Sequence, residues 1–556
     1  MPDAAPTKRT HLGSRPWHDL YDPGVPVDVA WDSQPLDRLL RSAAVRYPNR
    51  SALVFFDREI DYTTLDKLVD GAAAGLQRLG LRRGDRVSVF MPNCPQLVIA
   101  YEAIWRCGGV VVPSNPQYTS SEFAHQARDA GSRIAIVLSM LYERVRQVRD
   151  DLDLEQVGVT NIKEYFSGPT RALFTLLRER RGGHRVDFSA DPGTHPWSEV
   201  VGGGAPRPVT VGAADTAVLM YTGGTTGVPK AAQLTHDNLT ANVNQVSAFS
   251  PELRDGEEVM LTALPLTHSY AITVAMNQAM AKGFTQVLVP DPRDLVTVLK
   301  VIDHHEPTVF PGVPTLYSAI SRHRHVRSGK YDVSSISYCI SGAAALSPDV
   351  QNAFQEATGA RLVEGYGLSE ASPVTHCNPL AGADNAGAIG VPVPGTDCRI
   401  VDEETETTVL GPGERGVLCV SGPQVMAGYW NRSEETGATL VTHAMGTVWL
   451  HTGDIAVMEP DGVFAIVDRK KDLILAGGGL NVYPREVEEA LTAHPLVMEA
   501  GVIGVPPGGE DQKVKAFVAL EDGAELTETE LLAYARERLA RYKVPREIEV
   551  RAELPT

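Results

Sequence analysis

The residues best suited to chemistry stand in one short run, VLMYTGGTTGVPKAAQLTH, at positions 218–236. Val218–Tyr221 is predicted to be a buried strand, and a run of small, hydroxylic and glycine residues from Thr222 to Gly227 follows it. Glycines let the backbone curl so that several N–H groups converge on an anion, and threonine hydroxyls add donors. Lys230 adds a full positive charge. The run therefore predicts a phosphate-binding loop, but not a Walker loop, because no Gly-Lys-Ser/Thr follows at the required spacing.

The elements around this loop alternate between helical and strand-like periodicity. Helices are predicted at Leu36–Tyr47, Thr63–Leu79, Gln96–Ala103 and Ser120–Ala130, and strands at Ser51–Phe56, Arg86–Phe90, Gly109–Pro113 and Arg133–Leu138. A second series of the same kind runs from residue 216 to about residue 391. Such alternation is typical of βα units on a largely parallel sheet.

The pattern changes in the last third of the chain. Residues 390–467 form short β-rich segments separated by Gly, Pro and Asp turns, which predict a small β-barrel or sheet. An α+β pattern follows the charged run DRKKD at 468–472, and Thr527 with Glu530 predicts a capping box that begins its second helix. We therefore expect an α/β protein: an N-terminal domain over 1–468, made of two βα-type subdomains and a small β-barrel, and a small α+β C-terminal domain over 469–556.

Composition excludes several classes of function. The net charge is −18, from 51 Lys and Arg against 69 Asp and Glu, which excludes a chain-wide electrostatic affinity for nucleic acid or anionic lipid. No stretch approaches the ~20 apolar residues of a membrane-spanning helix, and residues 1–17 lack the apolar core of a secretory signal. We expect a cytoplasmic protein with small-molecule substrates, no nucleic-acid partner and reduced cysteines. The sequence leaves the oligomeric state open.

The ordered string YTGGTTGVPK (221–230) resembles the signature of the adenylate-forming, AMP-binding superfamily, which contains acyl- and aryl-CoA synthetases, peptide-synthetase adenylation domains and luciferases. Further motifs stand in the family's order: IDYTTL (60–65), GGVVVPSNP (108–116), PLTHSYA (265–271), SGAAAL (341–346), EGYGLSEAS (364–372), HTGDIA (451–456), DRKKDLILAGGGLNVYPREVE (468–488) and ARYKVPREI (540–548). The C-terminal domain of such proteins rotates between two arrangements, so the resemblance implies a mobile domain here.

The resemblance implies attack of a substrate carboxylate on the α-phosphorus of ATP, followed by transfer of the acyl group to a thiol. ATP, Mg²⁺ and CoA are the implied cofactors and co-substrates. The β- and γ-phosphates would be held by the loop residues Thr222, Gly223, Gly224, Thr225, Thr226 and Gly227 together with Lys230. Magnesium would bind Glu370, with Thr222 as a second contact, since this ion prefers carboxylate and phosphate oxygens.

Other motif positions imply the remaining contacts. Tyr366 resembles the aromatic residue on which adenine stacks, and Ser369 the hydroxyl donor to the α-phosphate. Asp454 resembles the carboxylate that binds the ribose, Arg469 a second ribose or phosphate contact, and Lys471 the pivot of the C-terminal domain. The remaining expected nucleotide contacts are Gly342, Ala343, Glu364, Gly365 and Gly367.

His268 resembles a residue that lies near the acyl carboxylate and can gate its pocket; a structural histidine is the alternative. The predicted catalytic set is therefore Lys230, Thr226, His268, Glu370 and Lys471.

The sequence stops at Glu553–Thr556, where the resemblance implies a final motif with a lysine that bridges the acyl carboxylate and ATP. We expect the natural protein to continue beyond Thr556, and the 556-residue chain to bind ATP but to adenylate weakly. The alternative is a catalytically silent member that only binds a nucleotide or an acyl-adenylate.

The sequence constrains the identity of the substrate acid and of the thiol acceptor less than it constrains the family resemblance. GGVVVPSNP resembles the version found in acyl-CoA synthetases, and the basic, apolar segment 162–185 is similar to an insert of bacterial long-chain fatty acid–CoA ligases. We therefore expect a long- or medium-chain fatty acid–CoA ligase, with aryl-CoA formation or transfer to a carrier protein as alternatives. Segment 162–185 allows two interpretations, a peripheral membrane contact or a solvated surface insertion.

Overall fold

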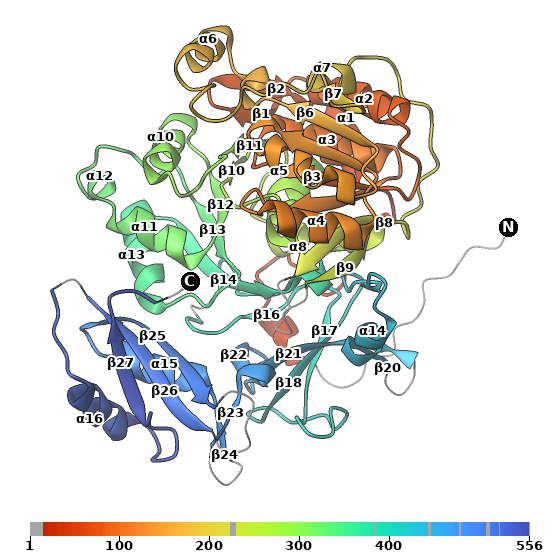
Figure 1. Cartoon of the computed structure of the whole chain (residues 1–556). Helices are drawn as coiled ribbons and strands as arrows, with labels where there is room; N and C mark the ends of the chain where they lie inside the picture. The colour runs from red at the N-terminus through yellow and green to blue at the C-terminus, as the bar shows by residue number, and fades with distance from the viewer. Residues whose placement is uncertain are drawn as a thin grey trace. The chain divides into compact units, whose positions relative to one another are not determined.

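The chain divides into two compact units in its computed structural model, which describes residues 15–222, 229–382, 385–442, 446–476, 480–506, 512–521 and 523–554 (Figure 1). Unit 1 comprises residues 1–397 and 421–441, and unit 2 comprises residues 398–420 and 442–556. The predicted boundary at residue 468 does not coincide with this division, because most of the β-rich segment falls into unit 2. The expectation that residues from 469 onward move as a domain remains a prediction.

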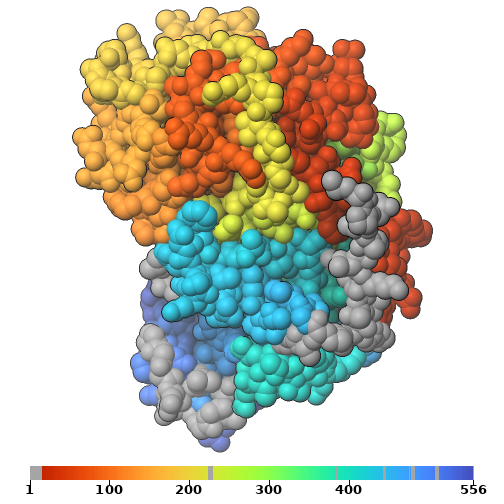
Figure 2. Space-filling view, turned by 90° about the vertical axis from the view of Figure 1, so that its right-hand side faces the viewer, coloured from red at the N-terminus to blue at the C-terminus, as the bar shows by residue number. Residues whose placement is uncertain are grey.

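The first sheet of unit 1 carries the strands that flank the glycine-rich run. In spatial order the strands are β19 (Gly428–Tyr429), β9 (Lys230–Thr235), β8 (Thr216–Thr222), β4 (Val110–Ser114), β3 (Arg86–Phe90), β5 (Ile134–Leu138), β6 (Gln156–Thr160) and β7 (Thr194–Pro196). The six strands from β8 to β7 are parallel, whereas β9 is antiparallel to β8 and to β19. The segment 421–441, cyan in Figure 2, accordingly lies beside the yellow part of the chain.

The second sheet of unit 1 has nine strands. Their order is β16 (Val391–Pro392), β15 (Val374–Cys377), β14 (Arg361–Gly367), β13 (Tyr338–Ser341), β12 (Val309–Gly312), β10 (Val259–Thr262), β11 (Thr285–Leu288), β1 (Ser51–Phe55) and β2 (Arg58–Asp61). The pairs from β14 to β1 are parallel, so their carboxyl ends meet at one edge. The edge strands β16 and β2, and β15 beside β16, pair antiparallel with their neighbours.

Helices cover these sheets. They are α1 (Asp37–Arg46), α2 (Tyr62–Arg78), α3 (Pro95–Arg106), α4 (Ser120–Ala130), α5 (Tyr142–Arg146), α6 (Gly168–Leu177), α7 (Trp197–Val200), α8 (His236–Phe249), α9 (Gln278–Lys282), α10 (Leu295–His305), α11 (Pro314–Arg322), α12 (Arg324–Arg327), α13 (Pro348–Thr358) and α14 (Ser433–Thr439). Helices α3 and α4 pack on the first sheet and α13 on the second (Figure 1). Fully buried aromatic residues such as Phe90, Trp105 and Phe123 fill the core beneath α3 and α4.

Three smaller sheets lie wholly or mostly in unit 2. Five strands form the first of them: β17 (Asp397–Val401), β18 (Arg415–Ser421), β20 (Leu440–Thr442), β21 (Val448–Met458) and β22 (Phe464–Arg469). A two-stranded sheet of β23 (Ile474–Ala476) and β24 (Leu480–Val482) follows. The last sheet joins β25 (Val497–Val505), β26 (Lys513–Leu520) and β27 (Glu547–Arg551), and it shares an apolar core with α15 (Pro484–Thr492) and α16 (Glu528–Arg538). The predicted capping box of Thr527 and Glu530 is confirmed at the start of α16.

Candidate active site

A cavity of about 670 Å³ lies in unit 1 at the carboxyl ends of the second sheet's parallel strands. Its lining includes residues that directly follow β10, β12 and β13: Ala263, Leu264 and Pro265, then Val313, then Gly342 and Ala343. In open α/β sheets ligands bind at this edge, and a volume between about 300 and 1,000 Å³ is usual for a small-molecule site. Most of the lining side chains are apolar, including Val246 and Phe249 of α8 and Leu316 of α11.

Segment 268–277 forms another wall of the cavity. A π-helix, η5 (Ala271–Asn277), lies between β10 and α9, and its Ala271 and Val274 line the cavity together with His268 and Tyr270. Each π-turn contains one residue more than an α-turn, and such turns often occur at functional sites. The backbone therefore changes its helical period next to a candidate ligand.

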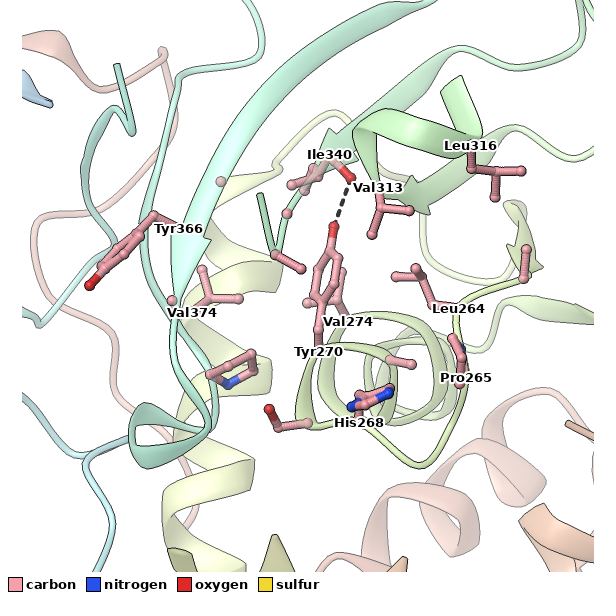
Figure 3. A pocket seen from close by; sticks show the side chains of 18 of the residues that line it. Leu264, Pro265, His268, Tyr270, Val274, Val313, Leu316, Ile340, Tyr366 and Val374 are labelled. Atoms are coloured by element: carbon pink, nitrogen blue, oxygen red, sulfur yellow. Dashed lines mark hydrogen bonds between the residues drawn. The ribbon is translucent and has the colours of Figure 1, made fainter. Parts of the chain in front are cut away.

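His268, which the resemblance places near an acyl carboxylate, lines the cavity (Figure 3). His268 is an exposed residue that lines the cavity, and neighbouring groups partly desolvate its ring. This partial desolvation lowers the pKa of His268 below its usual value, because burial disfavours the charged form. The imidazole is therefore predominantly neutral at pH 7 and offers one donor and one acceptor to a ligand.

Tyr270 crosses the cavity and explains the need for a glycine at position 342. Its hydroxyl donates to the Ile340 carbonyl at 2.7 Å, drawn as the dashed line in Figure 3. A Cβ atom added to Gly342 would lie 3.0 Å from Cε1 of that ring. The predicted small residues Gly342 and Ala343 both line the cavity. The Tyr270 ring thus leaves little room for a side chain at position 342.

The EGYGLSEAS motif contributes the end of β14 and the 3-10 helix η6 (Ser369–Ala371). Gly365, Tyr366, Gly367 and Ser369 all line the cavity. No side chain fits at Gly367, because its Cβ would lie 2.1 Å from the Pro373 carbonyl oxygen.

Ser369 and Glu364, both expected nucleotide contacts, differ in their position. The Oγ atom of Ser369 is 3.3 Å from that of Ser269, so two hydroxyls meet at one point of the cavity wall. Glu364 does not line this cavity; its carboxylate accepts a hydrogen bond from the Leu346 amide at 3.0 Å. Its side chain therefore holds the segment that follows β13.

Lys230 and Thr222 are register partners at the ends of β9 and β8. The Thr222 hydroxyl donates to the Lys230 carbonyl at 3.3 Å. The predicted loop residues Gly223, Gly224, Thr225, Thr226 and Gly227 lie outside the described residues. The structure thus describes the two strand ends between which the expected phosphate loop stands.

Glu370 and Lys230 are linked by Tyr429 of β19. The Tyr429 hydroxyl donates to Oε1 of Glu370 at 2.7 Å, and the Lys230 ammonium lies 5.5 Å from the centroid of the Tyr429 ring. Burial, and then the charge of Glu370, raise the pKa of the Tyr429 phenol well above its usual value. Tyr429 therefore stays protonated and donates to the carboxylate.

The donor set near Lys230 fits a magnesium ion that also binds phosphate. The described residues contain no group of three or more His, Cys, Asp or Glu side chains arranged for a metal. Mg²⁺ is commonly held by one or two carboxylates plus substrate phosphates. Glu370 offers that carboxylate, since only its Oε1 accepts a side-chain hydrogen bond from the described residues.

The predicted ribose contacts come together within unit 2. Asp454 of β21 and Arg469 of β22 are register partners, and Nε of Arg469 lies 2.9 Å from Oδ1 of Asp454. The Asp454 carboxylate is almost completely buried. Lys471 lies in the 3-10 helix η8 (Lys470–Asp472) and is exposed. All three predicted residues of this region thus lie in or beside the β21–β22 pair.

Tyr270 and Tyr429 were missed by the sequence analysis. Tyr270 stands two residues after His268 in PLTHSYA, so its position in a recognised motif was an available signal. Tyr429 stands in AGYW (427–430), outside the recognised motifs, and reaches Lys230 only because β19 pairs with β9. A contact between segments so far apart in sequence has no local signature.

Comparisons with known proteins agree with this architecture. The AMP-binding enzyme family matches residues 40–430, and the AMP-binding enzyme C-terminal domain matches residues 486–556. A long-chain-fatty-acid–CoA ligase of Bacillus subtilis (strain 168) is 42% identical over 547 residues, covering 97% of this chain and 95% of that protein.

Solved structures share the fold over nearly the full length. ATP-bound MatB from Rhodopseudomonas palustris matches with a TM-score of 0.80 and 27% identity, covering 94% of this chain and 96% of that one. A long-chain-fatty-acid-CoA ligase (FadD1) from Archaeoglobus fulgidus matches with a TM-score of 0.71 and 25% identity, covering 96% and 99%. The predicted α/β body with a small C-terminal domain is confirmed.

Proposed function

Because the chain belongs to the AMP-binding enzyme family, we propose that it activates a long- or medium-chain fatty acid with ATP and transfers the acyl group to CoA. The first step gives acyl-AMP and pyrophosphate, and the second gives acyl-CoA and AMP. The names of its relatives, the long-chain-fatty-acid–CoA ligases, support the choice of acid and acceptor.

One observation carries the proposal. Tyr366 and Ser369 of the EGYGLSEAS motif line a cavity that continues between apolar side chains. Among these side chains are Leu264, Val313 and Leu316. Figure 3 shows these three on the other side of the Tyr270 ring from Tyr366. Burial of a methylene group stabilises a bound chain by about 0.8 kcal/mol. A nucleotide at Tyr366 would therefore share one cavity with room for an alkyl chain.

The described residues suggest how the first step proceeds. Tyr366 would stack on adenine, Ser369 would donate to the α-phosphate, and neutral His268 would lie near the acyl carboxylate. Lys230 would neutralise phosphate charge, which matters because a carboxylate must approach a polyanion. When bound at Glu370, Mg²⁺ would supply further charge neutralisation.

Unit 2 would contribute to both half-reactions. Asp454 would accept hydrogen bonds from the ribose hydroxyls, with Arg469 beside it. We propose that the domain from residue 469 onward rotates about Lys471 between the adenylation step and the thioester step. Exposure of Lys471 supports this role, since a pivot residue must change its backbone angles without losing packing.

The test is a substrate panel on the full-length gene product. Octanoate, palmitate, benzoate, ferulate and amino acids are compared with Mg-ATP by pyrophosphate release and by mass spectrometry of the thioester, with CoA or a carrier protein as acceptor. Fatty acids with CoA are expected to exceed the other acids in kcat/KM by more than about tenfold, since a few buried methylenes supply that difference. Preformed palmitoyl-adenylate with CoA tests the second step alone.

A result in which aromatic or amino acids exceed every fatty acid tested would refute the proposed substrate class. A preference for a carrier protein over CoA would refute the acceptor. ATP binding without release of pyrophosphate for any acid would instead support the catalytically silent alternative.

We also propose that segment 162–185 makes a peripheral contact with anionic membranes. The side chains of Leu173, Leu176 and Leu177 on α6 are 59%, 81% and 55% exposed, and no residue of this helix is buried. Four exposed arginines follow and form no ion pair with the described residues: Arg178, Arg180, Arg181 and Arg185. Exposed leucines beside unpaired arginines are what an interfacial helix needs. Helix α6 lies at the outer edge of unit 1 (Figure 1).

This contact would be interfacial only. Among the described residues, none of the helices combines the length and apolar character needed to cross a bilayer.

A further inference from the structure

Tyr429 contacts two groups of opposite charge, the Lys230 ammonium and the Glu370 carboxylate. In the proposed function the ammonium binds phosphate and the carboxylate binds a metal ion. The Tyr429 ring lies under the Lys230 ammonium at 5.5 Å, and the Tyr429 hydroxyl donates to the Glu370 carboxylate at 2.7 Å. Lys230 and Glu370 themselves form no ion pair within 4.0 Å, with each other or with any other described residue. A cation and an anion therefore share one aromatic neighbour without meeting.

Two such charges attract each other strongly when they are half-buried, because the local dielectric is well below that of water. A direct ion pair would engage the ammonium that a phosphate needs and the carboxylate oxygen that a metal needs. The Tyr429 side chain satisfies each group differently. A ring face attracts the cation, and a phenol hydrogen bond stabilises the anion.

The Tyr429 backbone is held firmly enough to keep this position. Its strand pairs with β9, where Tyr429 is opposite Ala232, and its amide donates to the Thr436 hydroxyl at 2.9 Å. The Met426 amide donates to the Glu370 carbonyl at 2.8 Å. The segment 426–429 thus fixes both the backbone and the carboxylate of Glu370.

We propose that Tyr429 is a positioning residue that keeps Lys230 and Glu370 apart, so that the cation stays available to phosphate and the carboxylate to a metal ion. The assignment of those two ligands rests on the proposed function. The separation itself does not depend on it, because it is a property of the protein without ligands.

The first test measures that separation directly. The full-length protein is labelled with limiting acetic anhydride, and the rate at Lys230 is compared with the rates at the other lysines by peptide mass spectrometry. In Tyr429→Ala, Lys230 and Glu370 are expected to pair, which engages the ammonium in an ion pair and lowers its labelling rate about tenfold. Tyr429→Phe keeps the ring and is expected to label within about twofold of the wild type.

The double variant Tyr429→Ala/Glu370→Gln removes the partner and should restore the wild-type labelling rate. Tyr142→Phe is the matched control, because Tyr142 also donates to a carboxylate at 2.7 Å, that of Asp191, away from Lys230. Thermal unfolding checks that each variant is folded. An unchanged or faster labelling rate in Tyr429→Ala, or no recovery in the double variant, would overturn the proposal.

The second test follows nucleotide binding with a fluorescent ATP analogue at several magnesium concentrations. Tyr429→Ala is expected to weaken binding about tenfold, and Tyr429→Phe to raise the magnesium concentration at half-saturation several-fold, since only the hydrogen bond that orients Glu370 is lost. The proposal would be contradicted if all variants bound the ATP analogue with the wild-type affinity and this affinity did not change with the magnesium concentration. If the wild type forms no acyl-CoA, the proposed function fails while the labelling result still decides the role of Tyr429.

Discussion

At the scale of single residues, the shape of the cavity depends on the absence of a side chain at Gly342. Tyr270 cannot move away from Gly342 easily, because its hydroxyl is bonded to the Ile340 carbonyl and its ring packs among lining residues. A methyl group at position 342 would be closer to the ring than an ordinary van der Waals contact. The ring would have to turn into the space that a ligand uses.

Gly342→Ala is therefore expected to weaken fatty acid binding about tenfold, within the range of about 1–3 kcal/mol that overpacking costs. Displacement of a fluorescent fatty acid and the KM for palmitate measure the effect. Gly437→Ala serves as the control, because nothing lies within 4 Å of a Cβ at that position. Wild-type affinity in Gly342→Ala would show that the ring yields without filling the cavity.

At the scale of elements, α8 connects β9, the strand that begins at Lys230, to the cavity. It begins directly after β9, and its last turns carry Val246 and Phe249 into the lining. A capping box fixes its start: the Asn238 amide donates to the Thr235 hydroxyl at 3.1 Å, and the Thr235 amide donates to Asn238 Oδ1 at 3.0 Å. The position of the apolar wall thus depends on a cap at the other end of the helix.

Thr235→Ala is expected to lower the free energy of unfolding by about 1 kcal/mol, the usual cost of losing a helix cap. Thr235→Ser keeps the accepting oxygen and should remain close to the wild type. Urea denaturation followed by circular dichroism compares the three proteins. Equal destabilisation by both substitutions would mean that the methyl group, not the cap, is responsible.

Elements were predictable where a local pattern dictates them. The predicted strand Arg86–Phe90 and helix Ser120–Ala130 match β3 and α4 in both bounds, because the β-favouring residues of RVSVF and a Thr119–Glu122 capping box define them locally. The predicted helix Gln96–Ala103 is α3, which extends to Pro95–Arg106. The π-helix η5 was not foreseen, because an apolar run does not distinguish helical periods.

The same distinction holds for the site. Tyr366, Ser369 and His268 line one cavity, as their motifs predict, whereas the Tyr429 contact requires the pairing of two strands distant in sequence. Glu364 belongs to a predicted motif, yet its side chain serves the backbone of Leu346. Motifs therefore identified part of the lining but not the side chains that hold it.

At the scale of the whole molecule, a net charge of −18 opposes attraction to an anionic surface. Any membrane contact must therefore be local, and the exposed leucines of α6 with their neighbouring arginines are the candidate. Charge attraction brings such a helix to the headgroups, and apolar burial holds it there.

Replacing Leu173, Leu176 and Leu177 with serine is expected to lower binding to mixed phosphatidylglycerol–phosphatidylcholine vesicles at least about a hundredfold, since each buried leucine contributes about 1.5–3 kcal/mol. Vesicle sedimentation measures the bound fraction. Val409→Ser, at a valine that is 57% exposed, is the control. Undiminished binding of the triple variant would exclude α6 as the contact.

The number of residues in η5, which is seven, also determines how the side chains before it are oriented relative to those after it. Because each helical residue turns the chain by a set angle around the helix axis, deleting one residue there would turn His268 and Tyr270 relative to the buried α9. Either the side chains that meet the ligand or those that fill the interior would then point the wrong way. The count of residues in this segment, as well as their types, therefore governs which surfaces a bound molecule encounters.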